Sequence, residues 1–315
     1  MTDSLGHRSN VRGQFFSELK FAAIRRLERL LDPEAFHQIV ALFGRPNKAV
    51  KHCGPPIPLP ACLQQEGKRF LSVREKRRRD YFNRVLELFP DQLASPKWRD
   101  RVEFDGLEHL EPARKSKKPI VLAFSHFGPF YLLRPWLRAA GFPAATLNRG
   151  NAEIRPPLKR LADTVSPFPE IPPTFYQDQL RELVKFLESG HPLLIALDVD
   201  QGKQLQVPLD DQWQVRVASG PLRLAIRHQS ALLPCIITDL GRWRFRIKLG
   251  PPVAQELLRS GHEPEAVKQL VQSLLPEIRA HSEQCVPRVL NLFQPTALLK
   301  NSANPLAYVE PIAAG

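Results

Sequence analysis

Short apolar runs that alternate with helical segments are the feature that most constrains the fold of this chain. The run Ile120–Phe124 is followed at once by the turn residues of Ser125–Pro129, which is typical of a buried strand. Helical spacing returns over 131–137. The order predicts an α/β fold, in which a single layered domain has a central mixed sheet flanked by helices.

The same alternation continues toward the C-terminus and defines the other expected elements. Apolar runs predict strands over 144–147, 193–197, 232–238 and 243–249. Helical spacing predicts helices over 177–188, 219–227 and 263–285, with Gly190 ending the first and Pro276 bending or breaking the last.

The N-terminal residues predict an amphipathic helical segment outside the sheet. Over 14–31 an apolar stripe recurs at helical spacing, with basic residues mostly off the stripe: Phe16, Leu19, Ala23, Leu27 and Leu30 against Lys20, Arg25, Arg26 and Arg29. Such a helix either lies in a membrane interface or packs on the core with a solvated basic face. The Pro-rich stretch 54–60 is typical of a stiff connector. We therefore expect an N-terminal helical and Pro-rich segment over 1–70, an α/β domain over 71–300 and a loosely ordered tail over 301–315.

The charge of the chain indicates an anionic partner. There are 45 Lys and Arg against 32 Asp and Glu, a net charge of +13. Nucleic acid and an anionic membrane are the two broad options. No zinc finger, aromatic RNA-binding strand or clear helix-turn-helix is present, and the basic residues concentrate in two helical segments, 14–31 and 72–89. This distribution favours anionic lipid over nucleic acid, although charge alone does not exclude the latter.

Cysteine usage and hydropathy predict where the chain works. Its 4 cysteines are scattered and form no CxxC pair, which favours reduced thiols in a cytosolic setting and no structural zinc. No apolar run reaches the length of about 18 residues that a membrane-spanning helix requires. We expect a cytoplasmic protein that binds a membrane surface from outside the bilayer.

His126 is the strongest candidate for chemistry. It directly follows a predicted strand, beside the turn formed by Gly128 and Pro129, where α/β proteins place their functional groups. A neutral imidazole there can take a proton from a hydroxyl nucleophile. The alternative is a histidine that only hydrogen-bonds its own loop.

Between residues 77 and 288 a series of distinct short blocks follow one another along the chain: Arg78–Phe82, Val102–Leu110, Ser125–Gly128, Leu147–Arg149, Asp200–Gly202, Ser219–Leu224, Leu233–Pro234 and Leu249–Pro252. In that order they resemble the lysophospholipid acyltransferase superfamily, in particular its bacterial lipid A late acyltransferase branch. The resemblance implies transfer of a fatty acyl chain from an acyl carrier protein or coenzyme A thioester to a hydroxyl or amine of a lipid or glycolipid acceptor. It implies no metal and no cofactor beyond that thioester co-substrate. The location implied is the cytoplasmic face of the inner membrane, with the protein bound peripherally.

The family motif is a histidine, four residues, and then an acid, and here Tyr131 occupies the acidic position. A tyrosine is neutral near pH 7 and cannot balance the charge of an imidazolium. Two hypotheses stay open. Either Asp200 or Asp198, at the end of a neighbouring strand, replaces the carboxylate, or the chain is a catalytically impaired homologue that binds lipid or a partner protein. The candidate catalytic residues are therefore His126, Tyr131 and Asp200.

Other residues of the matched blocks are candidates for substrate binding. Arg149 resembles a family arginine whose guanidinium would hold a phosphate or a developing oxyanion; the alternative is a surface ion pair. Gln201 and Asp198 lie in the loop after a strand and either order that loop or face the substrate. Gly128 shapes the turn beside His126.

Overall fold

A computed structural model describes residues 18–43, 60–63, 85–148, 157–200 and 202–296. Its main sheet has seven strands in the order β1-β9-β8-β2-β5-β3-β4. Their bounds are β1 Val102–Asp105, β2 Ile120–Phe124, β3 Ala145–Asn148, β4 Thr174–Tyr176, β5 Pro192–Ala196, β8 Ala231–Gly241 and β9 Arg244–Leu249. Most neighbours pair in parallel, but β9 runs antiparallel to β8. The sheet is therefore mixed, as the sequence predicts.

Strand β2 lies at the centre of this sheet and explains why its sequence is continuously apolar. All of its residues are buried. Ile120, Leu122 and Phe124 join one core cluster, and Val121 and Ala123 join the other, on the opposite face. A strand covered on both faces needs no polar residue, so the run carries no alternation.

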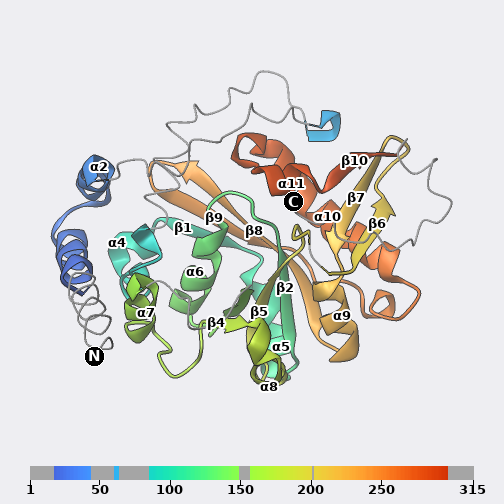
Figure 1. Cartoon of the computed structure of the whole chain (residues 1–315), viewed down its shortest axis with the longest axis horizontal. Helices are drawn as coiled ribbons and strands as arrows, with labels where there is room; N and C mark the ends of the chain where they lie inside the picture. The colour runs from blue at the N-terminus through green and yellow to red at the C-terminus, as the bar shows by residue number, and fades with distance from the viewer. Residues whose placement is uncertain (1–17, 44–59, 64–84, 149–156, 201, 297–315) are drawn as a thin grey trace, which may run out of the picture.

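Helices cover both faces of the sheet (Figure 1). Helices α8, α9 and α10 contribute buried residues to the cluster that contains Val121, and α4, α5 and α6 contribute to the cluster that contains Ile120. The α-helices after residue 84 are α4 Pro96–Arg99, α5 Glu111–Lys115, α6 Leu133–Ala139, α7 Pro157–Thr164, α8 Leu180–Glu188, α9 Gly220–Arg227, α10 Glu263–Ala280 and α11 Pro287–Leu290. The predicted fold class is confirmed: an α/β layered fold with a central mixed sheet.

The N-terminal helical segment packs on the core and also exposes apolar residues. Residues 18–30 are helical, and α2 Pro33–Phe43 follows. Phe21 and Phe36 are buried in one cluster with Trp98, and the buried Glu28 carboxylate accepts a hydrogen bond from the Trp98 indole at 2.6 Å. Leu19 and Leu30, by contrast, are 58% and 72% exposed. Of the described members of the expected stripe, Leu19, Ala23 and Leu30 are exposed and only Leu27 packs against the core. The buried Phe21 is not part of that stripe, and Phe16 lies outside the described residues.

An ion pair fastens the same helix to the body of the protein. Arg25 contacts both carboxylate oxygens of Asp91, at 2.7 and 2.5 Å. Burial tends to raise the pKa of Asp91, but hydrogen bonds from Arg25 and Gln92 outweigh burial and hold that pKa below its ordinary value of 3.8. The contact is therefore strongest with an ionised carboxylate.

A second, three-stranded sheet was not expected from the sequence. It contains β6 Gln204–Pro208, β7 Trp213–Ala218 and β10 Phe293–Pro295, in the order β10-β7-β6. It lies near α10 and α11, at the end of the molecule away from α2 (Figure 1). The helix expected over 263–285 ends earlier, at Ala280, and continues as the short 3-10 helix η9, Ser282–Gln284.

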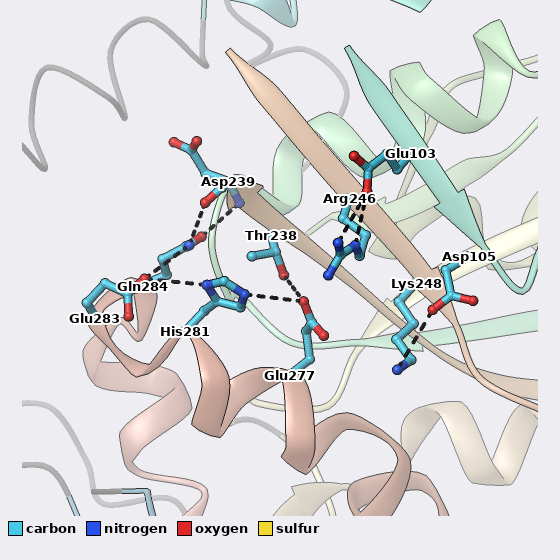
Figure 2. A network of polar contacts seen from close by, with 10 residues as sticks. All are labelled: Glu103, Asp105, Thr238, Asp239, Arg246, Lys248, Glu277, His281, Glu283 and Gln284. Carbon is cyan, nitrogen blue, oxygen red and sulfur yellow. Dashed lines mark hydrogen bonds and ion pairs between the residues drawn. The ribbon is translucent and has the colours of Figure 1, made fainter. Parts of the chain in front are cut away.

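The edge of the main sheet carries charged side chains. Arg246 pairs with Glu103 at 3.2 Å and Lys248 with Asp105 at 3.8 Å, across the parallel strands β9 and β1 (Figure 2). Charges on a short edge strand disfavour pairing with another chain.

Within the described part of the chain, none of the helices has both the length and the apolar content to cross a bilayer. The Pro-rich connector up to residue 59 and the tail from 301 lie outside the described residues.

Candidate active site

His126 and Asp198 follow two adjacent parallel strands at the centre of the sheet. Phe124, the last residue of β2, is in register with Ala196, the last residue of β5. The pairing extends one step further, because the Leu197 amide donates to the Phe124 carbonyl at 2.7 Å. The next residues therefore leave the sheet side by side at its carboxyl edge, where α/β proteins bind ligands.

The two residues form a doubly hydrogen-bonded pair. Asp198 Oδ1 lies 2.7 Å from His126 Nδ1, and Asp198 Oδ2 accepts the backbone N–H of His126 at 2.8 Å. The Asp198 carboxylate is fully buried, whereas the imidazole remains 17% exposed. One carboxylate thus fixes both the backbone and the ring of His126.

This arrangement defines the tautomer of the imidazole. An ionised carboxylate has no proton to donate, so Nδ1 must carry the hydrogen of the contact with Asp198. In the neutral ring Nε2 is then an acceptor, and no protein group among the described residues hydrogen-bonds it. The ring is also packed edge-on against Phe130, with 4.4 Å between ring centroids. His126 therefore presents one basic nitrogen from a fixed ring.

Gly128 gives the turn after His126 its shape. Its φ is +52°, in the left-handed region that favours glycine. A Cβ at this position would lie 2.6 Å from the Ile237 carbonyl oxygen and 2.9 Å from Gln284 Oε1. The turn therefore approaches β8 and η9 more closely than any side chain permits.

A cavity of about 720 Å³ opens beside the imidazole. Part of its lining is apolar, from residues of β2, β5 and the chain from the turn after β2 to the start of α6: Phe124, Phe130, Leu133, Leu194 and Ile195. Three cationic side chains lie elsewhere on the lining: Lys203, Arg223 and Arg288. Lys203 belongs to the loop before β6, and its carbonyl accepts the amide of Ser219, the residue before α9. The cavity therefore combines a surface for hydrocarbon with cations for an anionic group.

A buried polar group lines the same cavity on the side of α6. Arg134 donates to Thr174 Oγ1 at 2.8 Å and lies 3.6 Å from the buried Glu87 carboxylate. One turn further along α6, Arg138 is almost fully buried and donates to Ser166 Oγ and three backbone carbonyls, and burial lowers its pKa to about 10. These two arginines order the chain between α7 and β4.

The residues singled out from the sequence are only partly brought together. His126 and Asp198 are in contact, and Tyr131 and Asp200 line the cavity beside them. Asp200 is exposed, whereas Asp198 is buried against the imidazole, so only Asp198 holds Nδ1. Arg149 and Gln201 lie outside the described residues.

Sequence reasoning missed the cationic part of the cavity and its polar side. Arg134 follows Tyr131 at helical spacing and could have been noticed as the next residue on that face. Arg223 lies within the block Ser219–Leu224, but that block gave no role to the arginine, and nothing in the sequence near Arg288 or Glu87 separates these two residues from ordinary surface or core positions. In the described ranges, no group of three or more His, Cys, Asp or Glu side chains is arranged to hold a metal ion.

Fold and site together define an α/β protein with a His–carboxylate pair over a cavity at the carboxyl edge of its sheet. Comparison with protein-family models matches residues 89–286 to the bacterial lipid A biosynthesis acyltransferase family. The match covers more than half of the chain, and the protein belongs to this family of acyltransferases. A search of curated proteins returned no match. The resemblance found in the sequence is thereby confirmed.

Proposed function

We propose that the protein transfers a fatty acyl chain from an acyl thioester to a hydroxyl or amine of a lipid or glycolipid acceptor. The observation that carries this proposal is the 2.7 Å contact between His126 Nδ1 and Asp198 Oδ1 at the cavity. Membership in an acyltransferase family supports the reaction class. The thioester is carried by acyl carrier protein or coenzyme A.

In this reaction His126 acts as the general base. Nε2 takes the proton of the acceptor hydroxyl while the oxygen attacks the thioester carbonyl carbon. The C–S bond then breaks, and the imidazolium returns the proton to the leaving thiolate. Asp198 keeps the ring in the base-competent tautomer and stabilises the imidazolium. No protein nucleophile is required, because acceptor and donor react directly.

The cavity lining fits the two kinds of substrate group. Its apolar part can bury an acyl chain, at roughly 0.8 kcal/mol for each methylene removed from water. Lys203, Arg223 and Arg288 can hold an anionic group of the donor or the acceptor. In the described ranges Arg223 and Arg288 are exposed and make no ion pair with the protein, so binding such a group breaks no existing contact.

An acyl-transfer assay tests the proposal. Purified protein is incubated with a panel of acyl thioesters and membrane extract, and acylated lipids are identified by mass spectrometry. We expect transfer by the wild type and a loss of at least about a hundredfold in His126→Ala, the low end for removal of a general base. Unchanged transfer by a folded His126→Ala protein would remove His126 from the mechanism.

Tyr131 at the motif position supports a second candidate, a catalytically impaired homologue that binds lipid or a partner protein. In that case the wild type would bind anionic vesicles but transfer no acyl chain from any thioester. The two candidate functions differ in whether Asp198 can replace the acid of the family motif, that is, whether it can orient His126 and balance the charge of the imidazolium. The buried pair with His126 favours the enzyme.

We also infer that the protein works on the cytoplasmic face of the inner membrane. The exposed Leu19 and Leu30 lie on the N-terminal helix together with exposed Arg26 and Arg29. Apolar residues beside cations suit the interface of an anionic membrane. Nucleic acid has only the net charge in its favour.

A further inference from the structure

The turn that carries His126 is supported by the chain that follows α10. After Ala280 this chain forms η9, whose last residue, Gln284, is 7% exposed. Figure 2 shows the Gln284 side chain pointing toward β8 at Asp239. The support therefore comes from a part of the sequence far from the motif.

The Gln284 amide pairs with both backbone polar groups of Asp239. Its Oε1 accepts the Asp239 N–H at 3.0 Å, and its Nε2 donates to the Asp239 carbonyl at 2.8 Å. Strand β2 pairs with β8 only as far as Cys235, so β8 has no β2 partner at Asp239. The side chain takes the place of a neighbouring strand there, and both backbone groups remain satisfied.

The same residue touches the turn after His126. The Gly128 N–H donates to the backbone carbonyl of Gln284 at 3.4 Å. Gln284 Oε1 and the Ile237 carbonyl leave no room for a Cβ at Gly128, so the turn is seated between β8 and η9. Gln284 thus joins three pieces of chain: η9, the extension of β8 and the turn two residues beyond His126.

Other contacts fasten α10 to β8, and η9 to the end of α10, without Gln284. Thr238 Oγ1 donates to the buried Glu277 carboxylate at 2.9 Å. His281 lies between two carboxylates, with Nε2 3.7 Å from Glu277 and Nδ1 3.6 Å from Glu283 (Figure 2). Removal of the Gln284 amide alone should therefore leave the end of α10 in place.

We propose that Gln284 is a positioning residue for His126, acting through Gly128 and Asp239. The inference rests on the proposed function, in which His126 is the base. Asp198 fixes the ring from the side of β5, and Gln284 fixes the turn from the side of β8. Without the Gln284 side-chain amide, η9 is no longer tied to Asp239, so the Gln284 backbone carbonyl that accepts the Gly128 N–H shifts, and the imidazole moves relative to Asp198. A misplacement of about 1 Å in a reacting group can cost about a hundredfold in rate.

The test compares Gln284→Leu with a matched control, Gln269→Leu. Gln269 also lies on the α10 segment, and its Oε1 accepts one backbone N–H, that of Ala254 at 3.2 Å. Neither Gln269 nor Ala254 lines the cavity. Both variants replace a glutamine by an apolar residue of similar size and remove hydrogen bonds to backbone.

Two measurements are made on both variants: kcat and KM for acyl transfer, and the crystal structure. In Gln284→Leu we expect kcat to fall by about a hundredfold with KM changed by less than about threefold. In its crystal structure we expect the distance between His126 Nδ1 and Asp198 Oδ1 to exceed about 3.5 Å, beyond hydrogen-bond range. In Gln269→Leu we expect kcat and this distance to match the wild type, even if the melting temperature falls.

A lower melting temperature in Gln284→Leu with wild-type kcat and an unchanged distance would overturn the proposal and leave Gln284 a merely structural residue. If the wild type transfers no acyl chain, the proposed function fails, and the distance alone decides whether Gln284 positions His126. If Gln284→Leu does not fold, Gln284→Glu replaces it, because that change keeps an acceptor for Asp239 N–H and loses the donor. A normal kcat and distance in Gln284→Glu would also overturn the proposal.

Discussion

Asp198→Asn is the perturbation that tests the mechanism most directly, because the two side chains have the same size and shape. In the wild type, Oδ2 of Asp198 accepts the His126 backbone N–H at 2.8 Å. An asparagine must keep its carbonyl oxygen there, since an NH₂ group would face another donor. Its NH₂ group then faces Nδ1 of the imidazole, where Oδ1 of the aspartate lies at 2.7 Å.

The expected magnitude follows from this geometry. An NH₂ group opposite Nδ1 makes Nδ1 an acceptor, so the neutral ring carries its proton on Nε2 and cannot act as a base. Asparagine in place of the aspartate that orients a catalytic histidine lowers kcat by about 10⁴ in the serine proteases, through the wrong tautomer. We expect a loss of roughly 10³ to 10⁴ in kcat, or about 4 to 5 kcal/mol in activation free energy.

The assay is acyl transfer under saturating thioester, with folding checked by circular dichroism and melting temperature. Asp211→Asn serves as the matched control, because Asp211 is exposed in the turn between β6 and β7. Asp200→Asn distinguishes the two candidate carboxylates, and we expect it to cost less than about tenfold, since Asp200 is exposed at the cavity. A folded Asp198→Asn protein that retained more than about a tenth of wild-type kcat would refute the reasoning.

Three further predictions concern the turn and the N-terminal helix. Gly128→Ala should lower both the melting temperature and kcat, because the new Cβ would lie 2.6 Å from the Ile237 carbonyl at a φ of +52°; thermal melts and the transfer assay measure this. Leu19→Glu with Leu30→Glu should weaken co-sedimentation with anionic vesicles while the circular dichroism spectrum stays unchanged; undiminished co-sedimentation would place the docking surface elsewhere. The folded-state pKa of Asp91 is lowered, so its ion pair with Arg25 stabilises the fold above the unfolded-state pKa, and this stabilisation disappears as the pH falls through the folded-state pKa. Asp91→Asn has no such stabilisation to lose, so its melting temperature below pH 3.8 should fall less than that of the wild type in thermal melts over this pH range.

The central strands could be predicted because burial on both faces leaves a continuous apolar run. Ile120–Phe124 shows this pattern, and β5 repeats it with only its final residue less than fully buried. The second sheet was missed because its strands mix polar with apolar residues. In β6, Gln204 and Gln206 alternate with Leu205 and Val207, which is a period of two that a closer reading could have used.

The candidate site could be predicted as a region but not as a pair. Asp198 and Asp200 both follow β5, and we placed Asp200 among the catalytic candidates and Asp198 among the substrate-binding ones, although the sequence offers no physical reason to prefer either as the partner of His126. The choice depends on how the chain leaves the strand. Continued pairing at Leu197 keeps Asp198 beside His126, and Asp200 lies further out and is exposed. A hydrogen bond between two loops cannot be derived from periodicity.

Gln284 shows a different limit of sequence reasoning. A helix expected to continue to Cys285 would have placed Gln284 on a helical face, but α10 ends at Ala280. The contacts of Gln284 with Asp239 arise only because the chain turns there into η9. A single glutamine carries no spacing or charge signal that would have identified it.

Tyr131→Glu tests whether the family acid is missing or replaced. If the absence of an acid at position 131 limits the rate of acyl transfer, a glutamate there should raise kcat. If Asp198 already supplies the anion, a second carboxylate in the same cavity adds like-charge repulsion and raises the pKa of one of the two acids. We expect kcat to be unchanged or lower in Tyr131→Glu.

Tyr131→Gln separates charge from shape in this test, since glutamine has the size of glutamate without its charge. We expect Tyr131→Gln to match or exceed Tyr131→Glu. The physical reason lies in the second contact of Asp198, whose Oδ2 holds the His126 backbone N–H as well. A glutamate at position 131 can add charge near the ring, but that amide already has its acceptor in Asp198. An increase in kcat in Tyr131→Glu beyond that of Tyr131→Gln would contradict this account and show that Asp198 does not fully replace the motif acid.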